Sequence, residues 1–242
     1  MSSELRKSQI NVAAIQQACS SDKAASLATT EKLVREAVAS GANLVILQEL
    51  HATLYFCQTE ETSVFELAEP IPGPTSKRLS DLARELGIVL VGSIFERRMN
   101  GVYHNTAVVF EKDGSLAGLY RKMHIPDDPG FYEKFYFTPG DAQFNDGRSG
   151  FTPIDTSVGR LGVLVCWDQW YPEAARLMAL AGAEVILLPT NFPPGAECMA
   201  EFVINARAME NAVFYAGINR VGTERGFRFI GKRNRGCTWR TG

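Results

Sequence analysis

The sequence contains few cysteines, lacks a long apolar run and carries almost no net charge. Five cysteines among 242 residues is a small, odd number, which argues against the disulfide framework of a secreted protein. Its longer apolar runs, such as Leu161 to Trp167, are far shorter than the roughly 20 residues that a membrane span needs. The first eight residues are polar, and no hydrophobic signal segment follows them. We therefore expect a cytoplasmic protein that does not act on a membrane.

The charge balance and the histidines exclude two further classes of function. The chain has 25 basic and 27 acidic residues, and its formal charge is −2, with lysine and arginine scattered along it. Such a distribution is not typical of a general nucleic-acid binder. His51, His104 and His124 are also scattered and form no convincing metal cluster with the cysteines. We expect no nucleic-acid partner and no metal.

Short apolar runs alternate with segments of helical periodicity. The pattern predicts strands at 12–16, 43–48, 88–95, 105–110, 115–121, 161–166, 184–188 and 213–219, and helices at 21–40, 75–86, 172–181 and 197–211. Lys112-Asp113-Gly114 is a hairpin turn between two of these strands. Segment 127–150 shows no period, and a loop of that length is more often functional than idle. The alternation predicts an α/β fold with helices outside packed sheets, but it does not predict the strand order.

The segment GVLVCWDQWYPE (162–173) contains a candidate nucleophile. A predicted strand ends at Cys166, and the next helix begins near Pro172, because proline is favoured at the first helical position. The positive end of a helix lowers the pKa of a nearby thiol and favours the thiolate. The alternative is a buried core cysteine. The polar Asp168 and Gln169 just beyond favour a functional cysteine.

Three charged residues at the ends of other segments could act with Cys166. Glu49 ends an apolar run, so its carboxylate is either solvated at the strand tip or held by a cation. Lys122 follows the hairpin, where the alternative is an ordinary surface lysine. Glu133 lies among aromatic residues and is either shielded by them or the partner of a surface lysine. Together these residues offer a base, a cation and a nucleophile, but their spacing does not show that they meet.

Four stretches resemble the carbon–nitrogen hydrolase (nitrilase) superfamily: NLVILQE (43–49), YHNTAVVF (103–110), YRKMHIPDDPGFYEKFYFTPGD (120–141) and GVLVCWDQWYPE (162–173). Over residues 9–190 the chain looks like the branch of that family that hydrolyses N-carbamoylputrescine. The resemblance implies one hydrolase domain over 1–242 with an α-β-β-α sandwich fold, in which two sheets lie between layers of helices. It also implies a catalytic triad of Glu49, Lys122 and Cys166, with a second catalytic glutamate at Glu133.

The activity that the resemblance implies is a thiol amidohydrolysis that yields putrescine, carbon dioxide and ammonia. Glu49 would accept the thiol proton of Cys166, and the thiolate would attack the carbamoyl carbon. Lys122 and the backbone N–H of Trp167 would stabilise the oxyanion, and Glu133 would hold Lys122 in place. Glu49 would then protonate the leaving nitrogen and activate the water that breaks the acyl-enzyme. No metal or organic cofactor is implied.

The substrate ends in an ammonium group, which needs a carboxylate or an aromatic face. Asp128, with Asp127 beside it, is the candidate carboxylate, and the alternative is that both aspartates only shape a turn. Tyr55 and Trp167 are candidate pocket walls, and Asn191 is a further pocket candidate. An alternative substrate is another N-carbamoyl amine, an N-carbamoyl amino acid or an ω-amide.

After Thr190 the sequence departs from this branch of the family. Segment 191–222 is more similar to other branches, and 232–242 does not resemble the strands expected to follow. We therefore expect a sandwich that lacks its C-terminal strands and exposes a sheet edge. If the C-terminus permits, the chain should form a homo-oligomer. A truncated, catalytically silent member of the family is the alternative.

Overall fold

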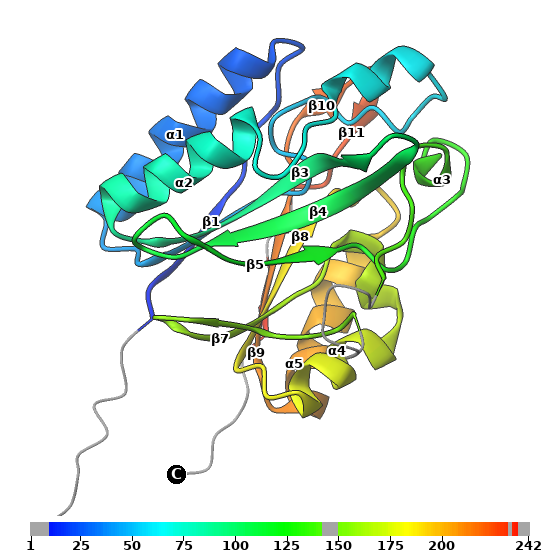
Figure 1. Cartoon of the computed structure of the whole chain (residues 1–242). Helices are drawn as coiled ribbons and strands as arrows, with labels where there is room; N and C mark the ends of the chain where they lie inside the picture. Colours follow the sequence, from blue (N-terminus) through cyan, green and yellow to red (C-terminus); the bar gives the residue numbers. More distant parts are fainter. Residues whose placement is uncertain (1–9, 142–149, 232–233, 237–242) are drawn as a thin grey trace, which may run out of the picture.

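Two five-stranded sheets lie face to face between layers of helices (Figure 1). The computed structural model describes residues 10–141, 150–231 and 234–236. The first sheet has the order β1 (Val12–Ile15), β2 (Leu44–Leu47), β3 (Val89–Met99), β4 (Val102–Phe110) and β5 (Leu116–Arg121). The second has the order β12 (Asn234–Gly236), β9 (Phe214–Asn219), β8 (Val185–Thr190), β7 (Gly159–Val163) and β6 (Ile154–Thr156). In each sheet three neighbouring strands run parallel: β1–β2–β3 in the first and β7–β8–β9 in the second.

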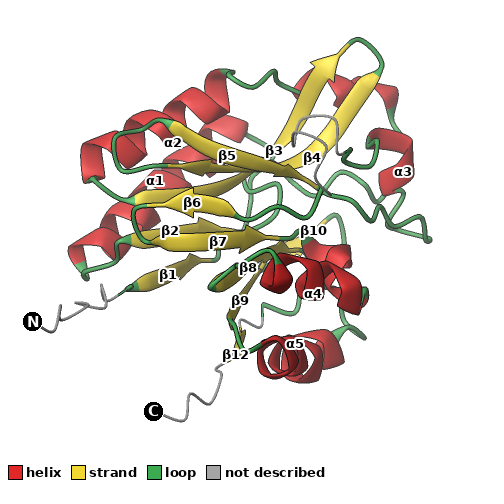
Figure 2. Cartoon of the chain, turned by 60° about the horizontal axis from the view of Figure 1, so that its bottom comes forward, coloured by secondary structure: helices red, strands yellow, loops and turns green. Residues whose placement is uncertain are grey.

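Helices cover the outer face of each sheet (Figures 1 and 2). Helices α1 (Lys23–Ala39) and α2 (Pro74–Leu86) pack on the first sheet, and α4 (Pro172–Leu180) and α5 (Ile204–Asn211) on the second. The shorter elements are η1 (Thr62–Leu67), α3 (Glu133–Tyr136), η3 (Cys166–Trp170), η4 (Met199–Val203) and the hairpin of β10 (Thr223–Glu224) with β11 (Phe227–Arg228). Of the helices in the described part of the chain, none has the length and apolarity required to cross a membrane.

Strand β2 shows how the four layers are held together. Its residues are all buried, but alternate side chains point to opposite faces. Leu44 and Ile46 join the core between the two sheets, whereas Val45 and Leu47 join the core under α1 and α2. Burial on both faces explains why the strand reads as a continuous apolar run. The α-β-β-α sandwich predicted from the sequence is confirmed.

The predicted helix ends agree with the structure to within two residues, with η4 and α5 together forming the helix predicted at 197–211, because the local signals are strong. Helix α1 begins after Asp22, whose carboxylate accepts a hydrogen bond from the N–H of Ala24 at 2.8 Å. Helix α2 ends at Gly87, which has a left-handed φ of 64°. Helix α4 begins at Pro172 as predicted.

Several predicted strand boundaries are wrong. Strands β3 and β4 extend to a turn at Asn100-Gly101, a pair typical of tight hairpins that the sequence analysis did not use. The strand predicted to reach Cys166 ends at Val163, because the chain then turns into η3. The predicted loop 127–150 contains the short helix α3, and residues 142–149 of it lie outside the described residues.

The C-terminal segment contributes a strand that the sequence analysis did not predict. Strand β12 pairs antiparallel with β9, with Arg235 opposite Ala216. Within 232–242, the prediction of a tail without strands is therefore wrong at 234–236. Residues 232–233 and 237–242 lie outside the described residues, so the prediction that further C-terminal strands are missing stays a prediction.

Candidate active site

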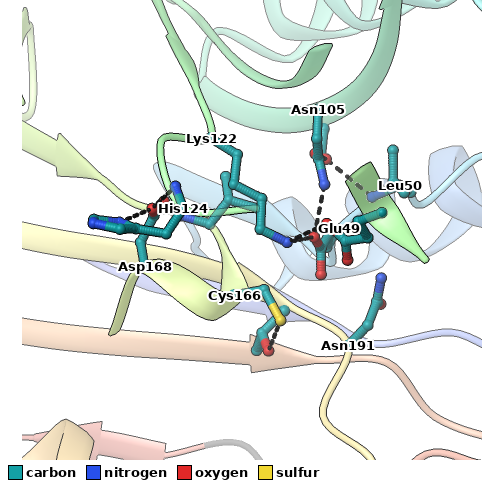
Figure 3. Close-up of polar contacts among 12 residues, drawn as sticks. Glu49, Leu50, Asn105, Lys122, His124, Cys166, Asp168 and Asn191 are labelled. Atoms are coloured by element: carbon teal, nitrogen blue, oxygen red, sulfur yellow. Dashed lines mark hydrogen bonds and ion pairs between the residues drawn. The ribbon is translucent and has the colours of Figure 1, made fainter. Parts of the chain in front are cut away.

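Three segments far apart in the sequence bring Glu49, Lys122 and Cys166 to one region (Figure 3). Glu49 follows β2, Lys122 follows β5 directly, and Cys166 opens η3 in the second sheet layer. The Lys122 ammonium donates a hydrogen bond to Glu49 Oε1 at 3.0 Å and another to Glu133 Oε2 at 2.6 Å. The side chains of Lys122 and Glu49 have no exposed surface. Lys122 is therefore not a surface lysine, and Glu49 is held by a cation rather than solvated.

The hydrogen bonds that orient the Glu49 carboxylate are made to one of its two oxygens, Oε1. Oε1 accepts a second hydrogen bond, from the Asn105 side-chain amide at 2.7 Å, and Figure 3 shows Lys122 and Asn105 pointing toward it. The other oxygen, Oε2, is buried and has no hydrogen-bond partner among the described residues. A fixed carboxylate with one unoccupied oxygen can accept a proton from a neighbouring group.

Cys166 is buried, and its surroundings favour the thiol. Burial raises the pKa of the Cys166 thiol well above its ordinary value; the charge of Glu49 raises it further, and that of Lys122 opposes this. The predicted lowering of the pKa is therefore wrong, and the largest cause of the opposite shift is desolvation by burial. Formation of the thiolate then requires transfer of the proton to a base.

The backbone turn at Cys166 is strained and is held by Asp168. Cys166 has a left-handed φ of 45°, which is uncommon for a residue with a side chain. The buried Asp168 carboxylate accepts hydrogen bonds from the N–H of Val165 at 2.9 Å and from the Tyr120 hydroxyl at 2.8 Å. Its other oxygen accepts from the His124 N–H at 3.0 Å and lies 2.8 Å from His124 Nδ1. Asp168 thus connects the turn of the second sheet to β5 of the first and to the residues that follow β5.

Glu133 is the second carboxylate that binds the Lys122 ammonium. Its Oε1 accepts a hydrogen bond from the Tyr55 hydroxyl at 2.9 Å. Burial raises the pKa of Glu133 to about 7, against the opposing effect of the Lys122 charge. Burial alone would lower the pKa of Lys122, but the charges of Glu133 and Glu49 outweigh it and raise that pKa well above its ordinary value. The ammonium therefore stays charged throughout the neutral pH range.

A cavity of about 310 Å³ opens beside Cys166. Its lining includes all four predicted pocket residues, Tyr55, Asp128, Trp167 and Asn191, together with Glu133. Asp128 is exposed, and it lies on this lining, whereas Asp127 does not. The described lining contains no lysine or arginine, so its charged groups are the two carboxylates.

The sequence analysis missed several residues that position this site. Thr190 donates a hydrogen bond from its hydroxyl to the Cys166 sulfur at 3.4 Å. Arg220 and Glu224 form a fully buried ion pair behind Glu49. The signal for this pair was present, because Arg220 directly follows an apolar strand and Glu224 lies four residues further on. The described residues include no group of three or more His, Cys, Asp or Glu side chains that could hold a metal ion.

The chain is similar to carbon–nitrogen hydrolases in sequence and in fold. The model of the carbon-nitrogen hydrolase family matches residues 11–232. An N-carbamoylputrescine amidase from Solanum lycopersicum is 44% identical over 223 residues, which cover 89% of this chain and 72% of the relative. A citrullinase from Francisella tularensis subsp. tularensis is 43% identical over 182 residues, 75% of this chain and 61% of the relative. The crystal structure of a carbon-nitrogen hydrolase from Helicobacter pylori G27 superimposes with a TM-score of 0.86 at 42% identity, covering 93% of this chain and 81% of that one.

Proposed function

The chain belongs to the carbon–nitrogen hydrolase family of amide-hydrolysing enzymes, and on that premise we propose that it hydrolyses N-carbamoylputrescine through an acyl-enzyme on Cys166. The observation that carries the proposal is the buried Lys122, which bridges Glu49 and Glu133 beside Cys166 at the cavity. Segments that follow strands of the first sheet and segments that follow strands of the second sheet both line this cavity, which supports a single hydrolase domain over the described residues.

In the first half of the reaction, Glu49 acts as the base. Its unoccupied Oε2 takes the thiol proton, and the Cys166 sulfur attacks the carbamoyl carbon. The resulting oxyanion is stabilised by the Lys122 ammonium and the backbone N–H of Trp167. Each donor of this kind is worth about 2.7–4 kcal/mol in transition-state stabilisation. The carbon–nitrogen bond then breaks, and the leaving nitrogen takes the proton from Glu49.

In the second half, water replaces the sulfur. Glu49 accepts a proton from the water, whose oxygen attacks the thioester carbon of the acyl-enzyme. The sulfur leaves and regains its proton, and a carbamic acid is released. The carbamic acid then decomposes to carbon dioxide and the second nitrogen product. The sum of both halves is putrescine, carbon dioxide and ammonia.

The charge of the cavity favours a substrate with an ammonium group. Asp128 is available to an ammonium among aromatic walls that include Tyr55 and Trp167. Glu133, in contrast, is already bound to Lys122. A substrate with a carboxylate would find no lysine or arginine on the described lining. This arrangement supports an N-carbamoyl diamine over an N-carbamoyl amino acid or an ω-amide.

Butylurea provides a sharp test, because it shares the carbamoyl group and the four-carbon chain of N-carbamoylputrescine but lacks the terminal ammonium. We expect N-carbamoylputrescine to have the higher kcat/KM, and citrulline to be a poor substrate. Since an exposed ion pair contributes about 0.2–1 kcal/mol, Asp128→Asn should reduce the preference for N-carbamoylputrescine over butylurea by up to about fivefold. Asp127→Asn is the matched control, because Asp127 does not line the cavity.

The outcomes of this assay separate the alternatives. Equal losses on both substrates in Asp128→Asn would show that Asp128 does not recognise the amine. If citrulline or an ω-amide is turned over faster than N-carbamoylputrescine, the assigned substrate is wrong but the proposed reaction on Cys166 still holds. Cys166→Ala should abolish turnover of every substrate while the circular dichroism spectrum is retained. Normal turnover by that variant would refute the mechanism, and silence of the unaltered chain on every substrate would support an inactive member of the family.

We also propose that the chain forms a homo-oligomer. The neighbouring elements α4, η4 and α5 expose large apolar side chains, Leu180 at 76%, Phe202 at 69% and Met209 at 65%. Helix α5 contacts both α4 and η4, and large exposed apolar side chains on neighbouring elements are typical of protein–protein contacts. Light scattering should give a mass of at least two chains, and Leu180→Lys should lower it. A single-chain mass for the unaltered protein would contradict the proposal.

A further inference from the structure

The buried ion pair of Arg220 and Glu224 is hydrogen-bonded to segments that carry the site. A guanidinium has five N–H donors, and all five of those on Arg220 are used. Arg220 Nη1 donates to Glu224 Oε1 at 2.7 Å and to the Thr53 carbonyl at 2.9 Å. Neither residue lines the cavity.

The other three donors of Arg220 hold Glu49 and the pocket wall. Nη2 donates to the carbonyls of Glu49 at 3.0 Å and Leu50 at 2.9 Å, and Nε donates to the Asn191 side-chain oxygen at 2.9 Å. Leu50 has a left-handed φ of 49°, so the turn that aims Glu49 is strained and persists only if its surroundings hold it. Two forked hydrogen bonds to consecutive carbonyls supply that restraint.

Glu224 extends the network to the opposite side of Lys122. Its second oxygen accepts a hydrogen bond from the Tyr55 N–H at 2.6 Å, and the Tyr55 hydroxyl donates to Glu133. The ion pair thus connects the backbone at Glu49 with the residue that orients Glu133. Both of these carboxylates bind the Lys122 ammonium.

We propose that Arg220 and Glu224 are positioning residues that set the location of Glu49 relative to Cys166 and to the pocket wall at Asn191. This inference rests on the proposed role of Glu49 as the base. A buried ion pair is weak evidence for stability, because desolvation offsets much of its attraction, so its use here is geometric. Misplacement of a catalytic group by about 1 Å can reduce the rate by about a hundredfold.

The test compares Arg220→Lys with a core variant that is remote from the site. Lysine keeps the charge but has three donors on one nitrogen and cannot reach all five acceptors. Leu82→Ala is the control, because Leu82 lies on the buried face of α2, belongs to the core cluster between that helix and the first sheet, and does not line the cavity. Both variants are assayed at a temperature at which circular dichroism shows them folded.

We expect Arg220→Lys to lower kcat by about a hundredfold and to change KM by less than threefold. Leu82→Ala should lose thermal stability but keep kcat within about twofold. If Arg220→Lys keeps kcat within twofold, or if Leu82→Ala loses as much activity, the positioning role is wrong. Should Arg220→Lys fail to fold, Glu224→Gln is assayed in its place. An amide nitrogen then replaces one of the two oxygens that accept from Arg220 and Tyr55, so kcat should fall at least tenfold, and a kcat within twofold of the unaltered chain would overturn the positioning role.

A second readout separates failure of this inference from failure of the proposed function. Iodoacetamide alkylates the Cys166 sulfur without any need for the correct substrate, and the rate depends on deprotonation of the thiol. Mass spectrometry should show at least tenfold slower alkylation of Cys166 in Arg220→Lys than in the unaltered chain and in Leu82→Ala. Equal alkylation rates would overturn the inference even if the chain hydrolyses N-carbamoylputrescine, and a slower rate would support it whichever amide is the substrate.

Discussion

Replacement of Lys122 by methionine isolates the effect of one buried cation. Methionine is similar in length and apolar, so the substitution removes the charge while the volume is nearly kept. Lys122 has no exposed surface and is hydrogen-bonded to Glu49 at 3.0 Å and to Glu133 at 2.6 Å. In the variant, two buried carboxylates face each other with no ammonium between them.

The magnitude follows from the burial of this ion pair. Removal of one partner from a buried pair costs about 3–5 kcal/mol, because the remaining charge is left without compensation. For a chain of this size, 1 kcal/mol corresponds to a Tm change of roughly 2–4 °C, so the Tm of Lys122→Met should fall by about 6–20 °C. Lys77→Met is the control, since Lys77 is 73% exposed and pairs with Asp81 on the surface of α2. It should cost no more than about 0.5 kcal/mol.

The loss of stability should also depend on pH. A carboxyl with a folded-state pKa above its unfolded value contributes stability at low pH, and this contribution is lost as the pH rises through the folded value. Burial already raises the pKa of Glu133 to about 7 with Lys122 present, and removal of the cation raises it further. The Lys122 contribution is fully present below pH 10 in the unaltered chain, because its pKa is raised. The difference between the two proteins should therefore be larger at pH 8 than at pH 5.

Urea unfolding at pH 5 and pH 8, followed by circular dichroism, measures this difference. Turnover should fall by at least a hundredfold at both pH values, since the oxyanion loses a donor. A loss of stability equal to that of Lys77→Met, or one that is the same at pH 5 and pH 8, would refute the assignment of Lys122 as a cation that compensates two buried carboxylates.

Three further substitutions test separate parts of the structure. Glu49→Gln removes the proton acceptor and should lower kcat by about 10²–10⁴-fold in an ammonia-release assay, whereas a loss below tenfold would exclude Glu49 as the base. Burial raises the pKa of Glu133 to about 7, so this carboxyl lowers the free energy of unfolding as the pH rises from about 4.5 to 7. Glu133→Gln should flatten this part of the pH profile in urea unfolding, and an unchanged slope would contradict the shift. Gly140→Ala would place a Cβ against the Arg121 carbonyl oxygen, closer than van der Waals contact allows, so thermal unfolding should reveal a cost of about 1–3 kcal/mol, and an unchanged Tm would argue against this close approach.

The part of the fold that local signals encode was predictable. The apolar run before Glu49 and the proline at 172 define a buried strand and a helix start, and both occur where expected. The Asn100-Gly101 turn was equally local but was not used, and the strands on either side of it were predicted too short. The family motifs also selected Glu49, Lys122, Glu133 and Cys166. In the structure Glu133 and Cys166 line one cavity, and the Lys122 ammonium is hydrogen-bonded to both Glu133 and Glu49.

Only the tertiary structure determined the burial, the hydrogen-bond partners and the pKa shifts of these groups. The sequence analysis expected a lowered pKa for Cys166, but the fold buries the thiol next to Glu49 and raises it. Arg220 reaches the Glu49 carbonyl across 171 positions of the chain, and His124 reaches Asp168 across 44. Local patterns encode which residues form a strand or a helix and which of their faces are buried. Desolvation and hydrogen bonding at a site depend on which distant segments pack together, and that is set by the stacking of the two sheets.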